Sequence, residues 1–179
     1  MKTLPIVGTA LLLVVTALAQ EKKPDKLAPY YPTPESVVEK MLKLGELKRG
    51  ERMFDLGSGD GRVVIMAAQK FGATATGIEI DGDLWKQSSA KIRSLGLEKN
   101  ARIIQGNILA QNYSSADVIC VYLLPGSNDK VRPMLEKQLK KGTRIVSHDF
   151  EFAGWKPEKT ETIDDDGEGR SHTLYLYRR

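Results

Sequence analysis

A glycine-rich segment has the residue types and spacing needed to hold a ligand. It runs from Asp55 to Gly61, reads DLGSGDG, and directly follows an apolar, strand-like run. Glycine lets the backbone turn tightly and lets a ligand lie against it without a Cβ in the way. A dinucleotide-binding loop follows G-x-G-x-x-G, whereas here the third glycine comes one residue early and Asp60 lies inside the loop. Because a carboxylate repels a diphosphate and attracts an ammonium or sulfonium group, the loop predicts a positively charged ligand.

Two polar residues lie where the next two strands should end. Glu79 follows a strand-like run that begins near residue 73, and Asn107 follows another at residues 102–105. An acid at the carboxyl end of a strand can accept hydrogen bonds from both hydroxyls of a ribose. The amide of Asn107 can bond the edge of an adenine. Together with the glycine loop, these residues predict a site for an adenosine ligand that is positively charged elsewhere.

This set of motifs, over about residues 55–150, resembles the class I S-adenosylmethionine-dependent methyltransferases. A closer likeness is to the archaeal broad-specificity protein lysine methyltransferases and to the mitochondrial lysine methyltransferases that act on the ATP synthase c subunit. The segments that carry it are Tyr30–Pro34 (YYPTP), Asp55–Arg62, Tyr122–Pro125 (YLLP), Gly142–Phe150 (GTRIVSHDF) and Gly154–Pro157 (GWKP). The resemblance implies an enzyme that uses S-adenosyl-L-methionine as cofactor and methylates a lysine presented by a protein substrate.

The resemblance also implies which residues bind the cofactor. They are Thr33, Asp55, Gly57, Ser58, Gly59, Gly61, Glu79 and Asn107. Asn107 stands where the family usually has aspartate. The YLLP segment replaces the N-P-P-aromatic tetrapeptide of enzymes that methylate glutamine, adenine and cytosine, so these substrates are disfavoured. A small-molecule methyltransferase, and a non-catalytic module that binds an adenosyl ligand, are the alternatives.

Methylation of lysine requires a neutral amine. The reference pKa of lysine is near 10.4, so deprotonation at neutral pH costs about 4.6 kcal/mol. Desolvation in an aromatic pocket beside the sulfonium lowers that pKa, and a tyrosine hydroxyl can orient the neutral amine. The candidates at predicted loops and strand ends are Tyr30, Tyr31, Tyr122, His148, Phe150 and Trp155. We predict catalytic roles for Tyr31, Tyr122, His148 and Trp155, with packing in the core as the alternative.

His148 is followed by Asp149, a carboxylate that could assist it as a base. Adjacent residues of a strand point to opposite faces of the sheet, so we expect no contact between these two side chains. The chain has two histidines. We expect no metal-binding partner for His148, and no metal site.

Strand-like and helix-like segments alternate from Arg52 onward, after a predicted helix that Thr33 caps and Pro34 begins. Strands are predicted at residues 52–56, 73–80, 102–105, 116–124 and 143–150, helices at 62–71, 83–95 and 128–139, and a link at 109–115. Residues 159–163 and 171–177 predict a hairpin. The alternation predicts an α/β fold with a parallel sheet covered by helices on both faces. The resemblance implies a Rossmann-like class I methyltransferase fold, with a mostly parallel seven-stranded sheet and a C-terminal antiparallel hairpin.

The N-terminus has the layout of a secretory signal peptide, with Lys2, an uncharged run from Leu4 to Leu18, and a small-x-small site that ends at Ala19. We therefore predict a signal peptide at residues 1–19, a linker and loop at 20–34, and a methyltransferase domain at 35–179. The uncharged run is shorter than the roughly 20 residues that span a bilayer, which favours export to the periplasm or the extracellular space. The alternative is an uncleaved anchor that keeps the domain in the cytoplasm, near a membrane, because three lysines follow the run.

The composition is that of one ordinary globular domain: 179 residues, 41% hydrophobic, 28% charged and 7% aromatic. A net charge of +4 is too small to indicate a nucleic-acid partner. We interpret the basic run from Lys130 to Arg144 as a solvated helix face, with a docking surface for an anionic partner as the alternative. The single cysteine, Cys120, excludes an intrachain disulfide and is predicted to be a buried, inert thiol.

Overall fold

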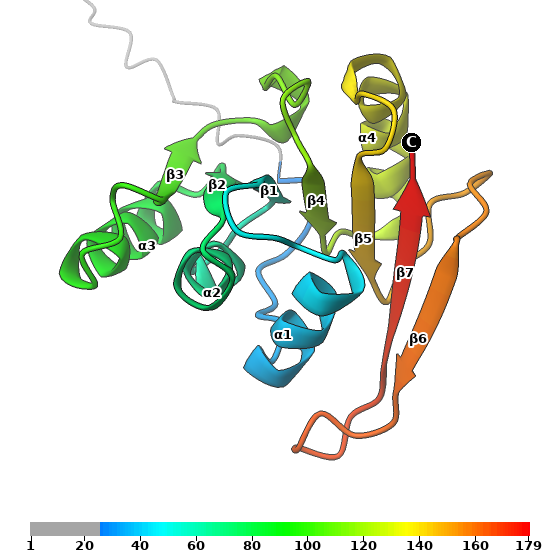
Figure 1. The fold of residues 1–179 in the computed structure, drawn as a ribbon, viewed down its shortest axis with the longest axis horizontal. Coiled ribbons are helices and arrows are strands. Elements are labelled where there is room, and N and C mark those ends of the chain that lie inside the picture. Colours follow the sequence, from blue (N-terminus) through cyan, green and yellow to red (C-terminus); the bar gives the residue numbers. More distant parts are fainter. Residues whose placement is uncertain (1–25) are drawn as a thin grey trace, which may run out of the picture.

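The computed structural model describes residues 26–179, which form a seven-stranded sheet (Figure 1). The strand order is β3-β2-β1-β4-β5-β7-β6, in which the first five strands are parallel and β7 is antiparallel to β5 and β6. The strands are β1 (Arg52–Leu56), β2 (Thr74–Glu79), β3 (Ala101–Gln105), β4 (Val118–Val121), β5 (Arg144–His148), β6 (Lys159–Ile163) and β7 (His172–Arg178). The predicted fold class, including the C-terminal antiparallel hairpin, is confirmed. The predicted signal peptide at residues 1–19 lies outside the described residues.

Helices cover both faces of the sheet (Figure 1). They are α1 (Glu35–Leu44), α2 (Arg62–Phe71), α3 (Gly82–Ser94), α4 (Pro125–Gln138) and a short 3-10 helix, η1 (Ile108–Ala110). The first three pack on one face and α4 on the other, and successive residues of β1 join opposite cores: Met53 packs with α1 and α2, and Phe54 with α4. Strands that are buried on both faces are apolar almost throughout, which is why the sequence predicts them. Within residues 26–179, no helix is long and apolar enough to cross a membrane.

The start of α1 differs from the prediction. Pro34 is the N-cap, the helix begins at Glu35, and no side chain caps it. Thr33 is therefore not the cap. Its Oγ1 lies 3.2 Å from Nδ1 of the buried His148, so Thr33 ties the N-terminal segment to the end of β5 instead.

Two other helices begin earlier than predicted. Helix α3 begins at Gly82 because the carboxylate of Asp81 accepts hydrogen bonds from the N–H groups of Asp83 and Leu84, which is the usual role of an N-cap aspartate. Helix α4 begins at Pro125, since a proline in the first turn loses no helical hydrogen bond. Both helices therefore start close to the carboxyl ends of the preceding strands.

The order of the strands reverses between β1 and β4, which are paired at the centre of the sheet. From β1 the chain continues to β2 and β3 on one side, and from β4 it continues to β5 on the other. In open α/β sheets, ligands bind outside the carboxyl ends of the strands at such a point. The segments that follow β1, β2, β3 and β4 meet here.

Candidate active site

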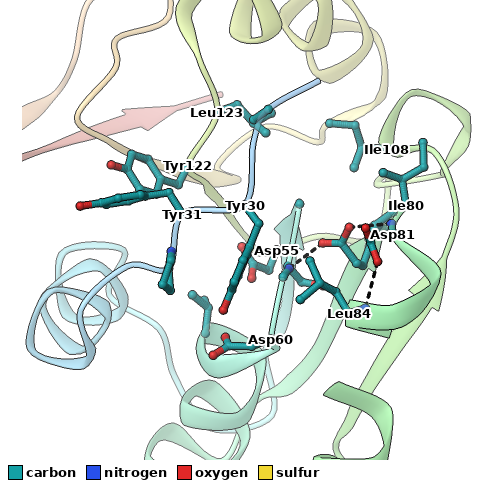
Figure 2. Close-up of a pocket in the computed structure, with 18 of the residues that line it drawn as sticks. Tyr30, Tyr31, Asp55, Asp60, Ile80, Asp81, Leu84, Ile108, Tyr122 and Leu123 are labelled. Atoms are coloured by element: carbon teal, nitrogen blue, oxygen red, sulfur yellow. Dashed lines mark hydrogen bonds between the residues drawn. The ribbon is translucent and has the colours of Figure 1, made fainter. Parts of the chain in front are cut away.

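A pocket lies at this edge of the sheet, where the ligands of open α/β sheets bind. The strand ends form its inner wall, and the N-terminal segment, residues 26–33, crosses its outer side (Figure 2). Seven of the predicted cofactor residues line it: Thr33, Asp55, Gly57, Ser58, Gly59, Glu79 and Asn107. Gly61 lies next to the pocket as the N-cap of α2.

The glycines of the loop are required by its backbone. Gly57, Gly59 and Gly61 have φ angles of 82°, 52° and 78°, in the left-handed region that other residues adopt only at a cost. At Gly59 there is also no space, because a Cβ would lie 2.8 Å from Cε2 of Tyr30. The ring of Tyr30 thus lies against the loop, and only glycine permits this approach.

Glu79 holds the loop in place. One of its carboxylate oxygens accepts a hydrogen bond from the N–H of Gly59 at 2.7 Å, and the other accepts one from the N–H of Asp81 at 2.8 Å. A carboxylate has about four acceptor positions, so Glu79 can still accept hydroxyl groups of a ligand. Its side chain therefore both shapes the glycine loop and borders the pocket.

Asp55 is a buried carboxyl group at the end of β1, and only 5% of the residue is exposed. Burial, with the nearby charges of Glu79 and Asp60, raises the pKa of Asp55 to about 8. Within residues 26–179, no lysine, arginine or histidine forms an ion pair with it. A cation placed in the pocket would favour the ionised form of Asp55, so the site fits a ligand with a sulfonium and an ammonium group.

Asp60 has a partner within its own loop. The guanidinium of Arg62 donates to the Asp60 carboxylate at 2.7 Å and to the carbonyl oxygen of Thr33 at 2.8 Å. Although burial opposes it, hydrogen bonding from Arg62 holds the pKa of Asp60 below its usual range. The N–H of Arg62 also donates to Asp60 at 3.1 Å. Asp60 thus supports the start of α2 and the attachment of the N-terminal segment.

Asn107 and Ser58 are polar residues that line the pocket. The side-chain oxygen of Asn107 accepts from the N–H of Leu109 at 2.8 Å, which leaves the amide N–H₂ as the group that could meet a ligand. The hydroxyl of Ser58 is buried and has no hydrogen-bond partner within the described residues. Such an orphaned group is unusual in a folded protein.

Three tyrosines line the open end of the pocket. Tyr30 and Tyr31, from the N-terminal segment, are 48% and 53% exposed. The ring of Tyr31 lies edge-on to that of Tyr122 at 6.5 Å, and Phe150 stacks on Tyr122 at 6.3 Å. The hydroxyl of Tyr122 donates to Asp149 at 3.2 Å, and burial and this carboxylate raise the pKa of Tyr122 to about 12. The mouth of the pocket is therefore aromatic, with one carboxylate behind it.

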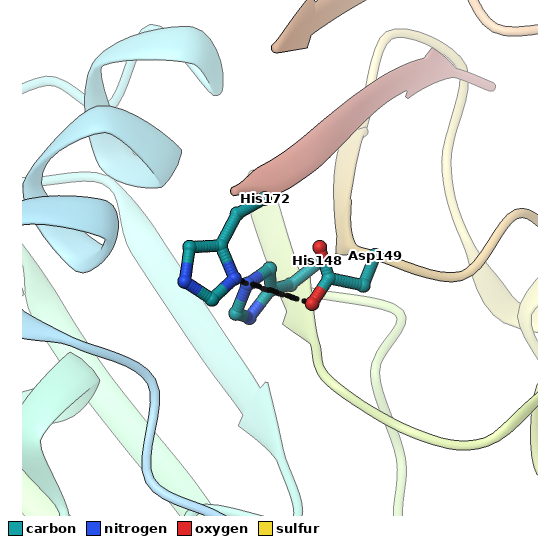
Figure 3. Close-up of side chains that lie close together, drawn as sticks. All are labelled: His148, Asp149 and His172. Atoms are coloured by element: carbon teal, nitrogen blue, oxygen red, sulfur yellow. Dashed lines mark hydrogen bonds and ion pairs between the residues drawn. The ribbon is translucent and has the colours of Figure 1, made fainter. Parts of the chain in front are cut away.

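His148 lies behind Tyr122, fully buried, with the two ring centres 3.9 Å apart. The expectation that His148 makes no contact with Asp149 is wrong, and so is the expectation that His148 has no neighbour of the metal-ligand type. Its Nε2 lies 2.9 Å from Nδ1 of His172 and 3.3 Å from Oδ2 of Asp149 (Figure 3). Asp149 has a φ of 58°, so β5 ends and the carboxylate turns back toward His148 instead of pointing to the opposite face. Burial and His172 lower the pKa of His148 to about 4, so the imidazole is neutral at pH 7.

Trp155 does not join the pocket. Its indole N–H donates to Glu136 on α4 at 2.8 Å, and its ring stacks on Phe152 at 4.7 Å. These contacts place it on the α4 side of the sheet, in the packing role that was the alternative. The structure therefore brings Tyr30, Tyr31 and Tyr122 together, places His148 behind them and leaves Trp155 apart.

Lys26, Asp81 and His172 were not singled out from the sequence. Lys26 pairs with Asp81 at 2.6 Å and closes one side of the pocket. An aspartate directly before a helix is a recognisable N-cap, so Asp81 had a signal in the sequence. His172 had none, because its neighbours are set by the pairing of β5 with β7.

Known proteins are similar to this chain in sequence and in fold. The family model described as "ANTKMT methyltransferase domain" matches residues 55–159. A protein-lysine N-methyltransferase of Saccharolobus islandicus is 41% identical over 150 residues, which cover 83% of this chain and 92% of that protein. The human lysine N-methyltransferase of the ATP synthase c subunit is 28% identical over 130 residues, or 73% of this chain and 55% of that protein. A crystal structure of a protein described as an RNA methyltransferase from Salinibacter ruber, in complex with S-adenosyl-L-homocysteine, superposes with a TM-score of 0.76 at 41% identity and covers 83% and 93% of the two chains.

Proposed function

The chain belongs to the ANTKMT methyltransferase domain family, and from this premise we propose that it methylates the side-chain amine of a lysine in a protein substrate, with S-adenosylmethionine as methyl donor. The observation that carries the proposal is a pocket with an acidic inner wall, Asp55 and Glu79, and an aromatic mouth, Tyr31 and Tyr122. The acids suit a cationic adenosyl ligand, and the open aromatic end suits a long side chain with a cationic head.

The residues of the inner wall bind and orient the cofactor. The left-handed backbone at Gly57 and Gly59 shapes the loop beside it, Glu79 accepts the ribose hydroxyls, and Asp55 offers a carboxylate to its positive charge. S-adenosylmethionine supplies an electrophilic methyl group on a sulfonium, which is already a good leaving group. The protein must therefore align the amine with that methyl group and exclude water.

The tyrosines at the mouth of the pocket orient and desolvate the lysine amine. The proton of the Tyr122 hydroxyl is directed to Asp149, so the phenolic oxygen presents its lone pairs to a donor in the pocket. A neutral lysine amine can donate one N–H to this oxygen while its own lone pair points at the methyl group. The rings of Tyr31 and Tyr122 remove water from the amine, which lowers its pKa.

The experiment that tests the proposal is transfer of tritiated methyl groups to separate protein, RNA and small-solute fractions. We expect labelled methyl-lysine in protein. Tyr122→Phe, which keeps the ring and removes the oxygen, should lower kcat by about 100-fold with little change in cofactor binding. Tyr175→Phe is the matched control, because Tyr175 lies on β7 and does not line the pocket.

An RNA substrate is the second candidate. It is favoured by the description of the Salinibacter ruber structure, which is 41% identical to this chain, as an RNA methyltransferase. Label confined to the RNA fraction would establish this candidate and overturn the first. Label confined to small solutes would indicate a small-molecule methyltransferase, and cofactor binding without any transfer would indicate a non-catalytic module.

We also propose that residues 1–19 direct export and are removed. The support is the basic start, the uncharged run and the small residues Ala17 and Ala19. N-terminal sequencing of the protein from its native host should find a chain that begins at Gln20. A chain that retains Met1, fractionates with membranes and resists protease in intact cells contradicts export and indicates an anchored domain in the cytoplasm.

A further inference from the structure

Both histidines of the chain lie in one cluster with an aspartate (Figure 3). Nε2 of His148, the last residue of β5, lies 2.9 Å from Nδ1 of His172, the first residue of β7. Oδ2 of Asp149 lies 3.3 Å from each of these two nitrogens. Three atoms of the ligand type therefore form a triangle, and within residues 26–179 no other three such side chains converge in this way.

The size of the triangle matches the ligands of one small divalent cation. Zn²⁺ takes imidazole nitrogen and carboxylate oxygen at about 2.0–2.2 Å in tetrahedral geometry. Neighbouring ligand atoms at that bond length are about 3.3 Å apart, which is the distance from Asp149 Oδ2 to either nitrogen. The two nitrogens are 2.9 Å apart, so the nitrogen–metal–nitrogen angle would be smaller than the tetrahedral angle. Imidazole with carboxylate also suits other first-row divalent ions.

The outer nitrogen of each imidazole has an acceptor. Nε2 of His172 lies 3.2 Å from Oδ2 of Asp166, and Nδ1 of His148 lies 3.2 Å from Oγ1 of Thr33. If each outer nitrogen donates its N–H, both inner nitrogens carry lone pairs that point at the same centre. Imidazoles that bind metals are held in this way, with the second N–H given to a carboxylate or another oxygen.

Hydrogen bonds also hold the carboxylate of Asp149 in place. Its Oδ1 accepts the N–H of Thr173 at 2.9 Å, and its Oδ2 accepts the hydroxyl of Tyr122. Its backbone has a φ of 58°, a strained conformation that persists where the surroundings enforce it and that clusters at functional sites. The side chain is 25% exposed, which gives an ion a path from solvent.

We propose that His148, Asp149 and His172 bind one divalent transition-metal ion of the Zn²⁺ class. The ion joins the end of β5 to the start of β7 and, through Thr33, to the N-terminal segment that crosses the pocket. This departs from the sequence-based expectation of no metal site, and it does not depend on the identity of the methylated substrate. The competing arrangement is a metal-free pair in which one imidazole donates its N–H to the other.

The test begins with the full chain purified without a histidine tag and treated with a chelator. Titration with Zn²⁺ in a calorimeter should show one saturable site per chain. Zn²⁺ should raise the Tm, because an ion that binds only the folded state stabilises it. With Co²⁺, the intense visible absorption of a tetrahedral site should appear. Absent or non-saturable binding at micromolar Zn²⁺ overturns the proposal.

Substitutions locate the site. His172→Gln and Asp149→Asn should each weaken Zn²⁺ binding by more than about 100-fold, and Asp166→Asn, which alters an outer partner, by about 10–100-fold. Asp164→Asn is the matched control, since it makes the same change at an exposed position of the same turn. Unchanged affinity in His172→Gln contradicts the assignment. If that variant does not fold, X-ray absorption of the wild type decides: two imidazoles per ion support the site, and none overturns it.

Discussion

Asp55 is a carboxyl group that the folded chain does not stabilise as an anion, because burial raises its pKa to about 8. A cationic cofactor needs the ionised form, so binding releases a proton at any pH below that value. We expect the Kd for S-adenosylmethionine to rise by up to about 10-fold per unit as the pH falls from 8 to 6. Calorimetry in two buffers of different ionisation enthalpy measures both the affinity and the released proton.

The same pKa determines a stability difference between the wild type and Asp55→Asn. The folded-state pKa, about 8, is raised above the reference value of 3.8, so the contribution of Asp55 to stability is complete below about pH 4 and is lost as the pH rises toward 8. Relative to Asp55→Asn, the wild type should lose up to about 1.4 kcal/mol of unfolding free energy per pH unit in that window. Thermal unfolding at several pH values measures this difference.

Asp83→Asn is the control for both Asp55 experiments, because Asp83 is exposed and lies at the start of α3. Asp55→Asn should gain Tm at pH 7 and still bind the cofactor at least about 10-fold more weakly. If Asp55→Asn is instead less stable than the wild type between pH 5 and 8, Asp55 is ionised without a ligand.

Gly59 combines a left-handed backbone with close contact to Tyr30. Gly59→Ala should cost about 1–2 kcal/mol for the φ of 52° and, in addition, displace Tyr30 and weaken cofactor binding. Gly96→Ala is the control, because Gly96 has a φ of 65° and a Cβ there meets nothing within 4 Å. Equal loss of stability in the two variants, with cofactor binding retained in Gly59→Ala, would contradict the role of this contact. Urea unfolding and calorimetry supply the two measurements.

At the scale of elements, one nearly buried ion pair fastens the start of β5 to the loop between α1 and β1. The side chain of Arg144 is 7% exposed, and its guanidinium pairs with Glu51 at 2.6 Å and donates to the carbonyl oxygen of Glu46 at 2.7 Å. Arg144→Met leaves Glu51 without its partner, and we expect a loss of about 3 kcal/mol in urea unfolding. Lys140→Met, which breaks the more exposed pair with Asp117, should cost less than about 1 kcal/mol. A similar loss in both variants would argue against a special role for Arg144.

The basic run from Lys130 to Arg144 divides into two parts in the structure. Lys130, Lys137, Lys140 and Lys141 are exposed on or after α4, whereas Arg144 is buried in its ion pair. The predicted solvated helix face therefore describes the lysines and not Arg144.

For the whole molecule, the N-terminal segment lines the pocket that we propose binds the cofactor. Lys26 pairs with Asp81, Ser127 donates to the carbonyl oxygen of Leu27, and Tyr30 lies on the glycine loop. A chain that begins at residue 35 should therefore bind S-adenosylmethionine at least about 10-fold more weakly than a chain that begins at residue 20, since an open site loses contacts and excludes less water. Calorimetry gives the affinities, and circular dichroism confirms that the shorter chain folds. Equal affinities would show that the segment does not contribute to binding.

The sequence alone predicts the strands, most helix positions and the cofactor loop, because these depend on local rules. Alternating strand-like and helix-like segments specify a parallel sheet. The residues that follow each parallel strand then lie at the same edge of that sheet. The sequence therefore predicts the glycine loop and Glu79 without knowledge of the fold. The predicted starts of the helices are less accurate. Thr33, for example, does not cap α1, because its hydroxyl contacts the distant His148.

Only the tertiary structure decides which distant side chains meet. The pairing of β5 with β7 brings His172 to His148, and the left-handed backbone of Asp149 turns its carboxylate to the same centre. Packing against α4 removes Trp155 from the pocket. The raised pKa of Asp55 likewise follows from burial and not from its position in a motif. Such contacts depend on strand register and on the path of the backbone, which no local pattern of residues records.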